Sequence, residues 1–201
     1  MLFRSRKILY FIATIILLFI TINLCIASEI DYSTDTLKSY CKQHSLSQNY
    51  AVLVDFSKHS GTYRFFVIDL NKDKVIAKSL CAHGAGNSSA STPTFSNKIG
   101  SNSSCLGHFK ITSKSKMKSR DMDCFKLKGM DNTNSNAEVR GILIHTSIVN
   151  NICKYGIYPF YLPTHKLISS GCFAIDSDTM ETIDRLLKQE SKPILLYAYY
   201  T

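Results

Sequence analysis

The chain contains the heptapeptide Ser169-Ser170-Gly171-Cys172-Phe173-Ala174-Ile175, in which a cysteine follows a glycine and opens an apolar run. A second apolar run, Gly141-Ile142-Leu143-Ile144, ends at His145. Both runs are typical of buried strands, which hold side chains rigidly. A cysteine attacks only as its thiolate, and a nearby imidazole is the usual means of forming one at neutral pH. We therefore predict a nucleophile at Cys172 with His145 as its base. The alternative is a buried cysteine and a core histidine that never meet.

The composition indicates one globular domain of ordinary size with an N-terminal extension. The chain has 201 residues, of which 45% are hydrophobic and 19% are charged. Its net charge of +9 favours an anionic partner, such as nucleic acid, acidic lipid or a wall polymer. The Lys and Arg residues are scattered, and the chain has no arginine-rich arm, zinc-finger spacing or RNA-binding aromatic motif. We therefore expect no nucleic-acid partner.

Residues 1–27 have the organisation of an export signal. Basic residues precede an apolar run over residues 8–22, and Ala27 stands at a plausible cleavage site. The apolar run is long for a signal peptide, so an uncleaved signal anchor is the alternative. The basic end should stay in the cytoplasm, which sends residues 28–201 into the cell envelope. Cleavage would lower the net charge from +9 to +6. We expect membrane contact only through this N-terminal segment.

The cysteines give little support for a metal site. Six of them follow the predicted signal: Cys41, Cys81, Cys105, Cys124, Cys153 and Cys172. No two form a CxxC pair, and no set of Cys and His has zinc spacing. An exported protein can form disulfides, so one disulfide among these residues stays open. We expect most of them to be small core residues, and we expect no metal or organic cofactor.

Hydrophobic patterning predicts a mainly β domain with a few helices. We expect one helix over residues 34–44 and another after Ile175, capped by Asp176, Ser177 or Asp178. Between the predicted histidine and cysteine lies an aromatic-rich segment, residues 150–167, which we expect to form a lid or a docking wall. The predicted strands cover residues 51–56, 64–70, 75–80, 110–112, 125–127, 141–144 and 194–200.

A series of short motifs resembles the catalytic domain of the murein L,D-transpeptidases, in the branch of the YkuD-like superfamily that keeps a phenylalanine-serine-asparagine signature. The likeness runs from about Thr34 to Tyr200. In order along the chain, the motifs are His83-Gly84, Phe95-Ser96-Asn97, Gly100-Ser101, Leu106-Gly107, Gly129, Arg140, Ile144-His145 and Ser170-Gly171-Cys172.

The resemblance implies a YkuD-like, β-sandwich-type domain over residues 28–201 that acts on peptidoglycan stem peptides without a cofactor. It implies that Cys172 attacks the bond between a diamino acid and D-alanine, with His145 as general base and acid. The carbonyl of Thr146 would orient the imidazole. The acyl group then passes to an amine of another stem. The backbone N–H groups of Gly171 and Cys172 are the expected oxyanion donors.

Four more residues are expected to contact the substrate: Ser169, Ser170, Arg140 and His83. Arg140 would pair with a carboxylate, with a structural ion pair as the alternative. Many relatives have His or Trp where this chain has Ser170, and Phe173 also departs from the family pattern. Two alternatives therefore stay open beside a transpeptidase: an L,D-carboxypeptidase, in which water resolves the acyl-enzyme, and a non-catalytic wall-binding module. We expect a monomer.

Overall fold

The computed structural model describes residues 32–86, 88, 92–117, 121–147 and 169–201. Residues Ser33–Thr201 form one compact unit. The predicted signal over residues 1–27 and the aromatic-rich segment over 150–167 lie outside the described residues. No helix within the described ranges is long and apolar enough to cross a membrane.

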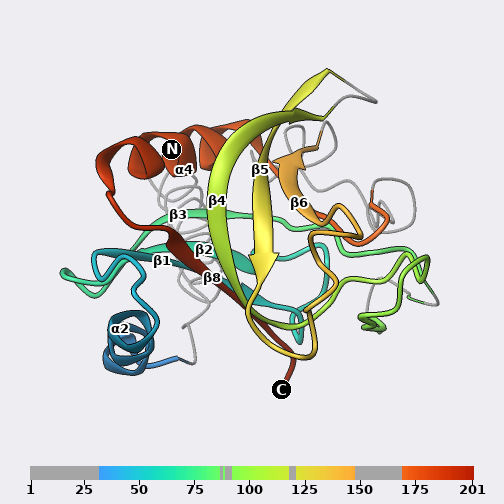
Figure 1. Cartoon of the computed structure of the whole chain (residues 1–201), viewed down its shortest axis with the longest axis horizontal. Coiled ribbons are helices and arrows are strands. Elements are labelled where there is room, and N and C mark those ends of the chain that lie inside the picture. The colour runs from blue at the N-terminus through green and yellow to red at the C-terminus, as the bar shows by residue number, and fades with distance from the viewer. Residues whose placement is uncertain (1–31, 87, 89–91, 118–120, 148–168) are drawn as a thin grey trace, which may run out of the picture. The chain divides into compact units, whose positions relative to one another are not determined.

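The described chain is mainly β, as predicted, with two helices (Figure 1). Its strands form one eight-stranded sheet in the order β3-β2-β1-β8-β4-β5-β6-β7. The pairs β1–β8 and β6–β7 are parallel, and the other neighbours are antiparallel. The bounds are β1 Tyr50–Asp55, β2 Phe65–Asp69, β3 Lys74–Ser79, β4 Gly107–Met117, β5 Met122–Gly129, β6 Leu143–Thr146, β7 Phe173–Ile175 and β8 Ile194–Tyr199.

Helices α2 (Thr34–Gln43) and α4 (Ser177–Gln189) confirm the two helical predictions. The Asp176 carboxylate accepts from the N–H of Thr179 at 2.8 Å and so caps α4. Met180, Ile183 and Leu186 form its buried face.

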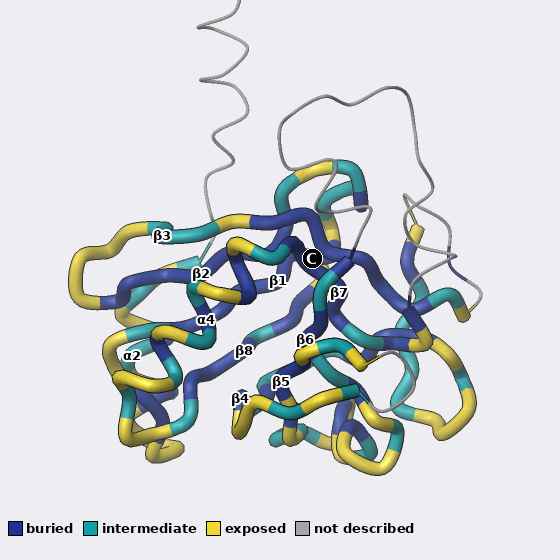
Figure 2. The backbone as a smooth tube through the Cα atoms, turned by 90° about the horizontal axis from the view of Figure 1, so that it is seen from above, coloured by how far each residue is buried: buried dark blue, intermediate teal, exposed yellow. Residues whose placement is uncertain are grey.

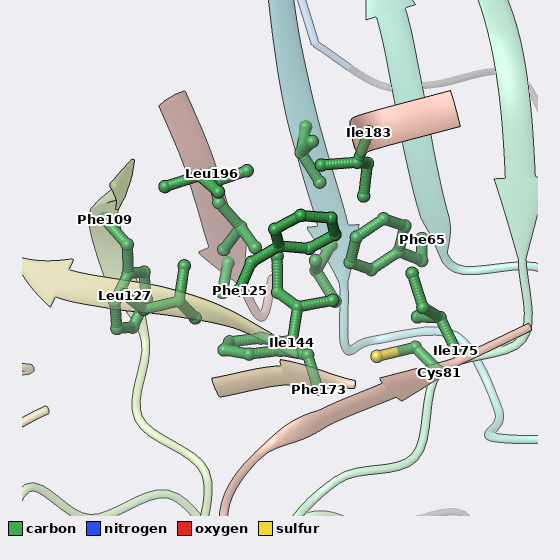
Figure 3. Packing of buried hydrophobic residues seen from close by; sticks show 14 of the residues in the cluster. Phe65, Cys81, Phe109, Phe125, Leu127, Ile144, Phe173, Ile175, Ile183 and Leu196 are labelled. Atoms are coloured by element: carbon green, nitrogen blue, oxygen red, sulfur yellow. The ribbon is translucent and has the colours of Figure 1, made fainter. Parts of the chain in front are cut away.

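One hydrophobic core joins the two halves of the sheet. Strand β2 contributes Phe65 and strand β5 contributes Phe125, and these rings lie close together beneath Ile183 of α4 (Figure 3). Almost every residue of β1, β2 and β8 is buried (Figure 2). Burial on both faces explains why these strands are continuous apolar runs in the sequence.

Strands β4 and β5 are longer than predicted. The outer part of β4, residues 113–117, is rich in lysine and serine, and β5 carries Asp123 and Lys128 near its ends. The apolar residues therefore mark only part of each strand. Cross-strand pairing continues from Phe109↔Gly129 to Met117↔Met122, with a bulge between Ile111 and Ser113. Backbone hydrogen bonding therefore extends strands that side-chain hydrophobicity alone did not reveal.

Candidate active site

Strand pairing brings Cys172 and His145 to the same face of the sheet. In the parallel pair β6–β7, His145 lies beside Ala174 and Ile144 lies beside Phe173. Continuing this register by one residue places Cys172 beside Leu143. Successive side chains alternate between faces, so Cys172 and His145 point to one side while Ile144 and Phe173 point into the core. His145 thus lies on β6 and Cys172 directly precedes β7, two positions apart along the continued register.

The His145 ring is held in one tautomer by its own strand. Its Nδ1 lies 2.8 Å from the carbonyl oxygen of Thr146, which is the contact expected from the resemblance. A carbonyl only accepts, so Nδ1 carries the proton and Nε2 is the basic nitrogen. The side chain is buried, with 2% of its surface exposed. This arrangement suits a base whose orientation is fixed before substrate arrives.

A tight turn supports the cysteine. The Ser169 hydroxyl donates to the carbonyl oxygen of Cys172 at 2.6 Å and accepts from the N–H of Gly171 at 3.0 Å. Gly171 has φ +120°, and a Cβ there would lie 2.7 Å from the carbonyl oxygen of Ser103. Only glycine fits this position without strain. The half-buried Cys172 directs its Sγ to the carbonyl oxygen of Gly141 at 3.4 Å.

A hydrogen bond from Ser104 orients the peptide group between Gly171 and Cys172. The fully buried Ser104 hydroxyl donates to the Gly171 carbonyl at 3.1 Å and accepts from the N–H of Gly84 at 2.9 Å. This peptide is trans, so the N–H of Cys172 points away from Ser104. The N–H of Gly171 already donates to Ser169. The N–H of Gly171 is therefore engaged within the turn, and the N–H of Cys172 is directed away from Ser104.

Arg140 holds the loop beneath the turn. Its Nη1 donates to the carbonyl oxygen of Ser96 at 2.6 Å, and its Nη2 donates to that of Ser103. These contacts fix the Ser/Gly-rich loop against Gly171 through neutral carbonyls, an arrangement that the sequence analysis did not anticipate. Ser170 is exposed at the tip of the turn, where it is open to a ligand.

His83 lies buried beside a buried arginine. Its Nδ1 is 2.7 Å from Nη2 of Arg64, and its ring meets Phe56 edge to face. Guanidinium groups only donate, so Nδ1 accepts and Nε2 carries the proton. Arg64 and Ser104 are the two supporting residues that sequence reasoning missed. A charged residue at the head of the apolar run Phe65-Phe66-Val67-Ile68 was the available signal for Arg64, whereas nothing distinguished Ser104 from neighbouring serines.

The buried cysteines are poor nucleophiles. Burial raises the pKa of the Cys41 and Cys105 thiols to about 11 and that of Cys81 to about 12. No disulfide joins the five cysteines in the part of the chain that the structure describes. The same part contains no cluster of three or more His, Cys, Asp or Glu that could hold a metal ion.

We predict that iodoacetamide at about pH 8 alkylates Cys172 in the native protein and leaves Cys41, Cys81 and Cys105 unmodified. At that pH only about one in a thousand of the thiols with a pKa of about 11 is ionised. Peptide mass spectrometry locates the label, and labelling in urea is the control for accessibility. Alkylation of Cys81 as rapid as that of Cys172 would contradict this assignment.

Comparison with known proteins identifies the family of the chain. The family model for the L,D-transpeptidase catalytic domain matches residues 26–199, so the chain belongs to this family. The family resemblance seen in the motifs is thereby confirmed. A search of curated proteins gave no match.

Three solved structures are similar to this chain at low sequence identity. An L,D-transpeptidase from Xylanimonas cellulosilytica has a TM-score of 0.40 and 11% identity, over 80% of this chain and 68% of that one. An L,D-transpeptidase from Mycobacterium smegmatis has a TM-score of 0.43 and 11% identity, over 75% and 58%. The helical cell shape determining protein Pgp2 from Campylobacter jejuni has a TM-score of 0.46 and 14% identity, over 84% and 56%. The chain thus spans less than two thirds of the latter two.

Proposed function

We propose that this protein is a peptidoglycan L,D-transpeptidase with Cys172 as nucleophile and His145 as general base and acid. The proposal rests on His145 of β6 and Cys172, directly before β7, which lie on one face of the sheet when the β6–β7 register is continued by one residue. His145 Nδ1 is held by the Thr146 carbonyl. Membership of the L,D-transpeptidase catalytic domain family supplies the reaction class.

The reaction begins when the thiol turns about its Cα–Cβ bond from the Gly141 carbonyl toward the imidazole. His145 Nε2 accepts the proton of Cys172 Sγ, and the thiolate attacks the carbonyl carbon of the diamino acid–D-alanine bond. The N–H of Cys172 stabilises the oxyanion, a contact that is typically worth about 3 kcal/mol. The C–N bond then breaks, and His145 returns the proton to the departing amine of D-alanine.

An amine of a second stem peptide completes the cycle. It attacks the thioester carbonyl, loses its proton to His145 and displaces the Cys172 thiolate, which forms the crosslink. Water in place of the amine gives L,D-carboxypeptidase activity, which is the second enzymatic candidate. Residues 28–201 form the catalytic domain in this proposal, and residues 1–27 deliver it to the cell envelope, where peptidoglycan lies.

The test is to detect the acyl-enzyme. The full-length protein is incubated with a soluble disaccharide tetrapeptide, quenched in acid and analysed by intact mass spectrometry. We expect a mass increase equal to the disaccharide tripeptide acyl group, located on Cys172, together with released D-alanine. Crosslinked dimers among the products identify transpeptidation, and tripeptides alone identify carboxypeptidation. If no adduct forms and no D-alanine is released, both enzymatic functions are rejected, and the non-catalytic wall-binding module is left.

A further inference from the structure

The face of the sheet that carries Cys172 and His145 continues onto β5. On that strand Phe125 and Leu127 point into the core, so Cys124, Lys126 and Lys128 point to the opposite side. Cys124 pairs with His145, and Lys126 pairs with Leu143. The β6–β7 register, continued by one residue, places Leu143 beside Cys172. Cys172 and Lys126 therefore share one row across the sheet. Two strand spacings separate their Cα atoms by about 10 Å.

Strand β4 adds a third lysine to this face. Lys110 lies between the core residues Phe109 and Ile111, and it pairs directly with Lys128 of β5. Lys126 and Lys128 are exposed and Lys110 is half-buried. Like charges on directly opposite residues destabilise a sheet, so this pair needs an explanation other than stability. We call Lys110, Lys126 and Lys128 the lysine surface.

The charges of the lysine surface are not neutralised within the described part of the chain, where none of its three members has an ion pair. Asp131, two residues after the end of β5, bonds to His108, at 2.9 Å from its Nδ1. Lysines of the opposite face and of α4 do have acid partners. They are Lys114 with Asp123 and Asp184, Lys116 with Asp121, and Lys188 with Asp184, at 2.8–3.3 Å. Within the described residues, the three members of the lysine surface thus differ from these lysines in having no acid partner.

We propose that the lysine surface binds carboxylates of the peptidoglycan stem peptide, with Lys126 nearest to the reacting bond. The proposal rests on the proposed function, because it assigns the anionic groups of that substrate to named residues. The carboxylate of the departing D-alanine is about 4 Å from the attacked carbon. A lysine side chain extends about 6 Å from its Cα, so Lys126 can reach this group from two strands away. Lys110 and Lys128 lie farther from the sulfur and meet carboxylates of the rest of the stem.

The test compares two triple variants of equal charge. One is K110Q/K126Q/K128Q, and the matched control is K114Q/K116Q/K188Q, which removes three lysines that have acid partners. Release of D-alanine from the soluble tetrapeptide is measured at low and high salt. At about 20 mM NaCl we expect the KM of the lysine-surface variant to be about tenfold above that of the wild type, because the attraction of its lysines for carboxylates is lost. Its kcat, and both the KM and the kcat of the control variant, should stay within about twofold of the wild-type values. At about 500 mM NaCl the difference should nearly vanish.

Two further experiments distinguish failure of this proposal from failure of the proposed function. A substrate whose D-alanine ends in a carboxamide should raise the KM of the wild type and leave that of the lysine-surface variant unchanged. Binding to purified sacculi is measured by sedimentation in the Cys172→Ala background, which requires no turnover. If the wild type proves inactive, loss of this binding in the lysine-surface variant alone still supports the proposal.

Equal KM values and equal sacculus binding for the two triple variants would overturn the proposal while leaving the reaction untouched. The same conclusion follows if the lysine-surface variant binds sacculi normally but no longer binds vesicles of phosphatidylglycerol. In that case the lysines serve an acidic membrane surface and not a stem peptide.

Discussion

Replacing Cys172 with alanine is expected to abolish release of D-alanine, with a loss of about 10⁴-fold or more in kcat/KM. The substitution removes Sγ of Cys172, the atom that forms the thioester in the proposed mechanism. The turn that holds residue 172 depends on other groups. The Ser169 hydroxyl bonds the backbone of residue 172, and Ser104 bonds the Gly171 carbonyl. The free energy of unfolding should therefore change by less than about 1 kcal/mol. Coupled detection of D-alanine measures the first effect, and urea unfolding measures the second.

His145→Ala tests whether the base belongs to the same unit. Nucleophile and base act together, so we expect the double variant Cys172→Ala/His145→Ala to be no less active than Cys172→Ala alone. His145→Ala by itself should also fail to form the acyl-enzyme at neutral pH, because no imidazole takes the thiol proton. A Cys172→Ala protein that releases D-alanine at more than a hundredth of the wild-type rate would exclude the proposed mechanism.

The sequence predicted the pairing of Cys172 with His145 because each residue borders a short apolar run, which His145 ends and Cys172 opens. Such runs become adjacent buried strands, and here they are β6 and β7. The sequence did not reveal the contacts of Ser104 or Arg64, because both depend on segments that meet only in the folded chain. The Ser104 hydroxyl bonds both Gly84, which is 20 residues earlier in the sequence, and Gly171, which is 67 residues later. Local patterns carry no information on pairings of this kind.

The roles of Arg140 and His83 show the same limit. A sequence offers a charged or aromatic side chain but not its partner. A substrate carboxylate and a backbone carbonyl are equally plausible acceptors for an arginine until the fold is known. In the structure, the Arg140 guanidinium bonds two carbonyls of the Ser/Gly-rich loop, and the His83 ring is bonded by Arg64. Strand prediction failed for a related reason on the outer parts of β4 and β5, where polar residues interrupt the apolar pattern.

Arg64→Met is expected to lower the free energy of unfolding by about 3–5 kcal/mol. Arg64 is fully buried, and its guanidinium donates to the carbonyl oxygens of Cys81 and Lys58 at 2.8 and 3.1 Å. It also donates to His83 Nδ1 at 2.7 Å. Methionine has similar length but no donor, so two carbonyls and one ring nitrogen would lose their partner in the interior. Urea unfolding at neutral pH measures the change.

The charge of Arg64 itself does not explain this effect. Burial lowers its pKa to about 10, against the opposing influence of Cys81 and Asp55, so the group stays protonated at neutral pH despite the cost of desolvation. The stabilisation comes from its hydrogen bonds and from packing over the Phe56 ring, 5.0 Å away. Lys74→Met removes a cation from an exposed position on β3 and should change the free energy of unfolding by less than about 0.5 kcal/mol. Equal stability of the two variants would show that the carbonyls of Cys81 and Lys58 do not need Arg64. In that case His83, which lies next to the bridge between Ala82 and Ala174, would be positioned by packing alone.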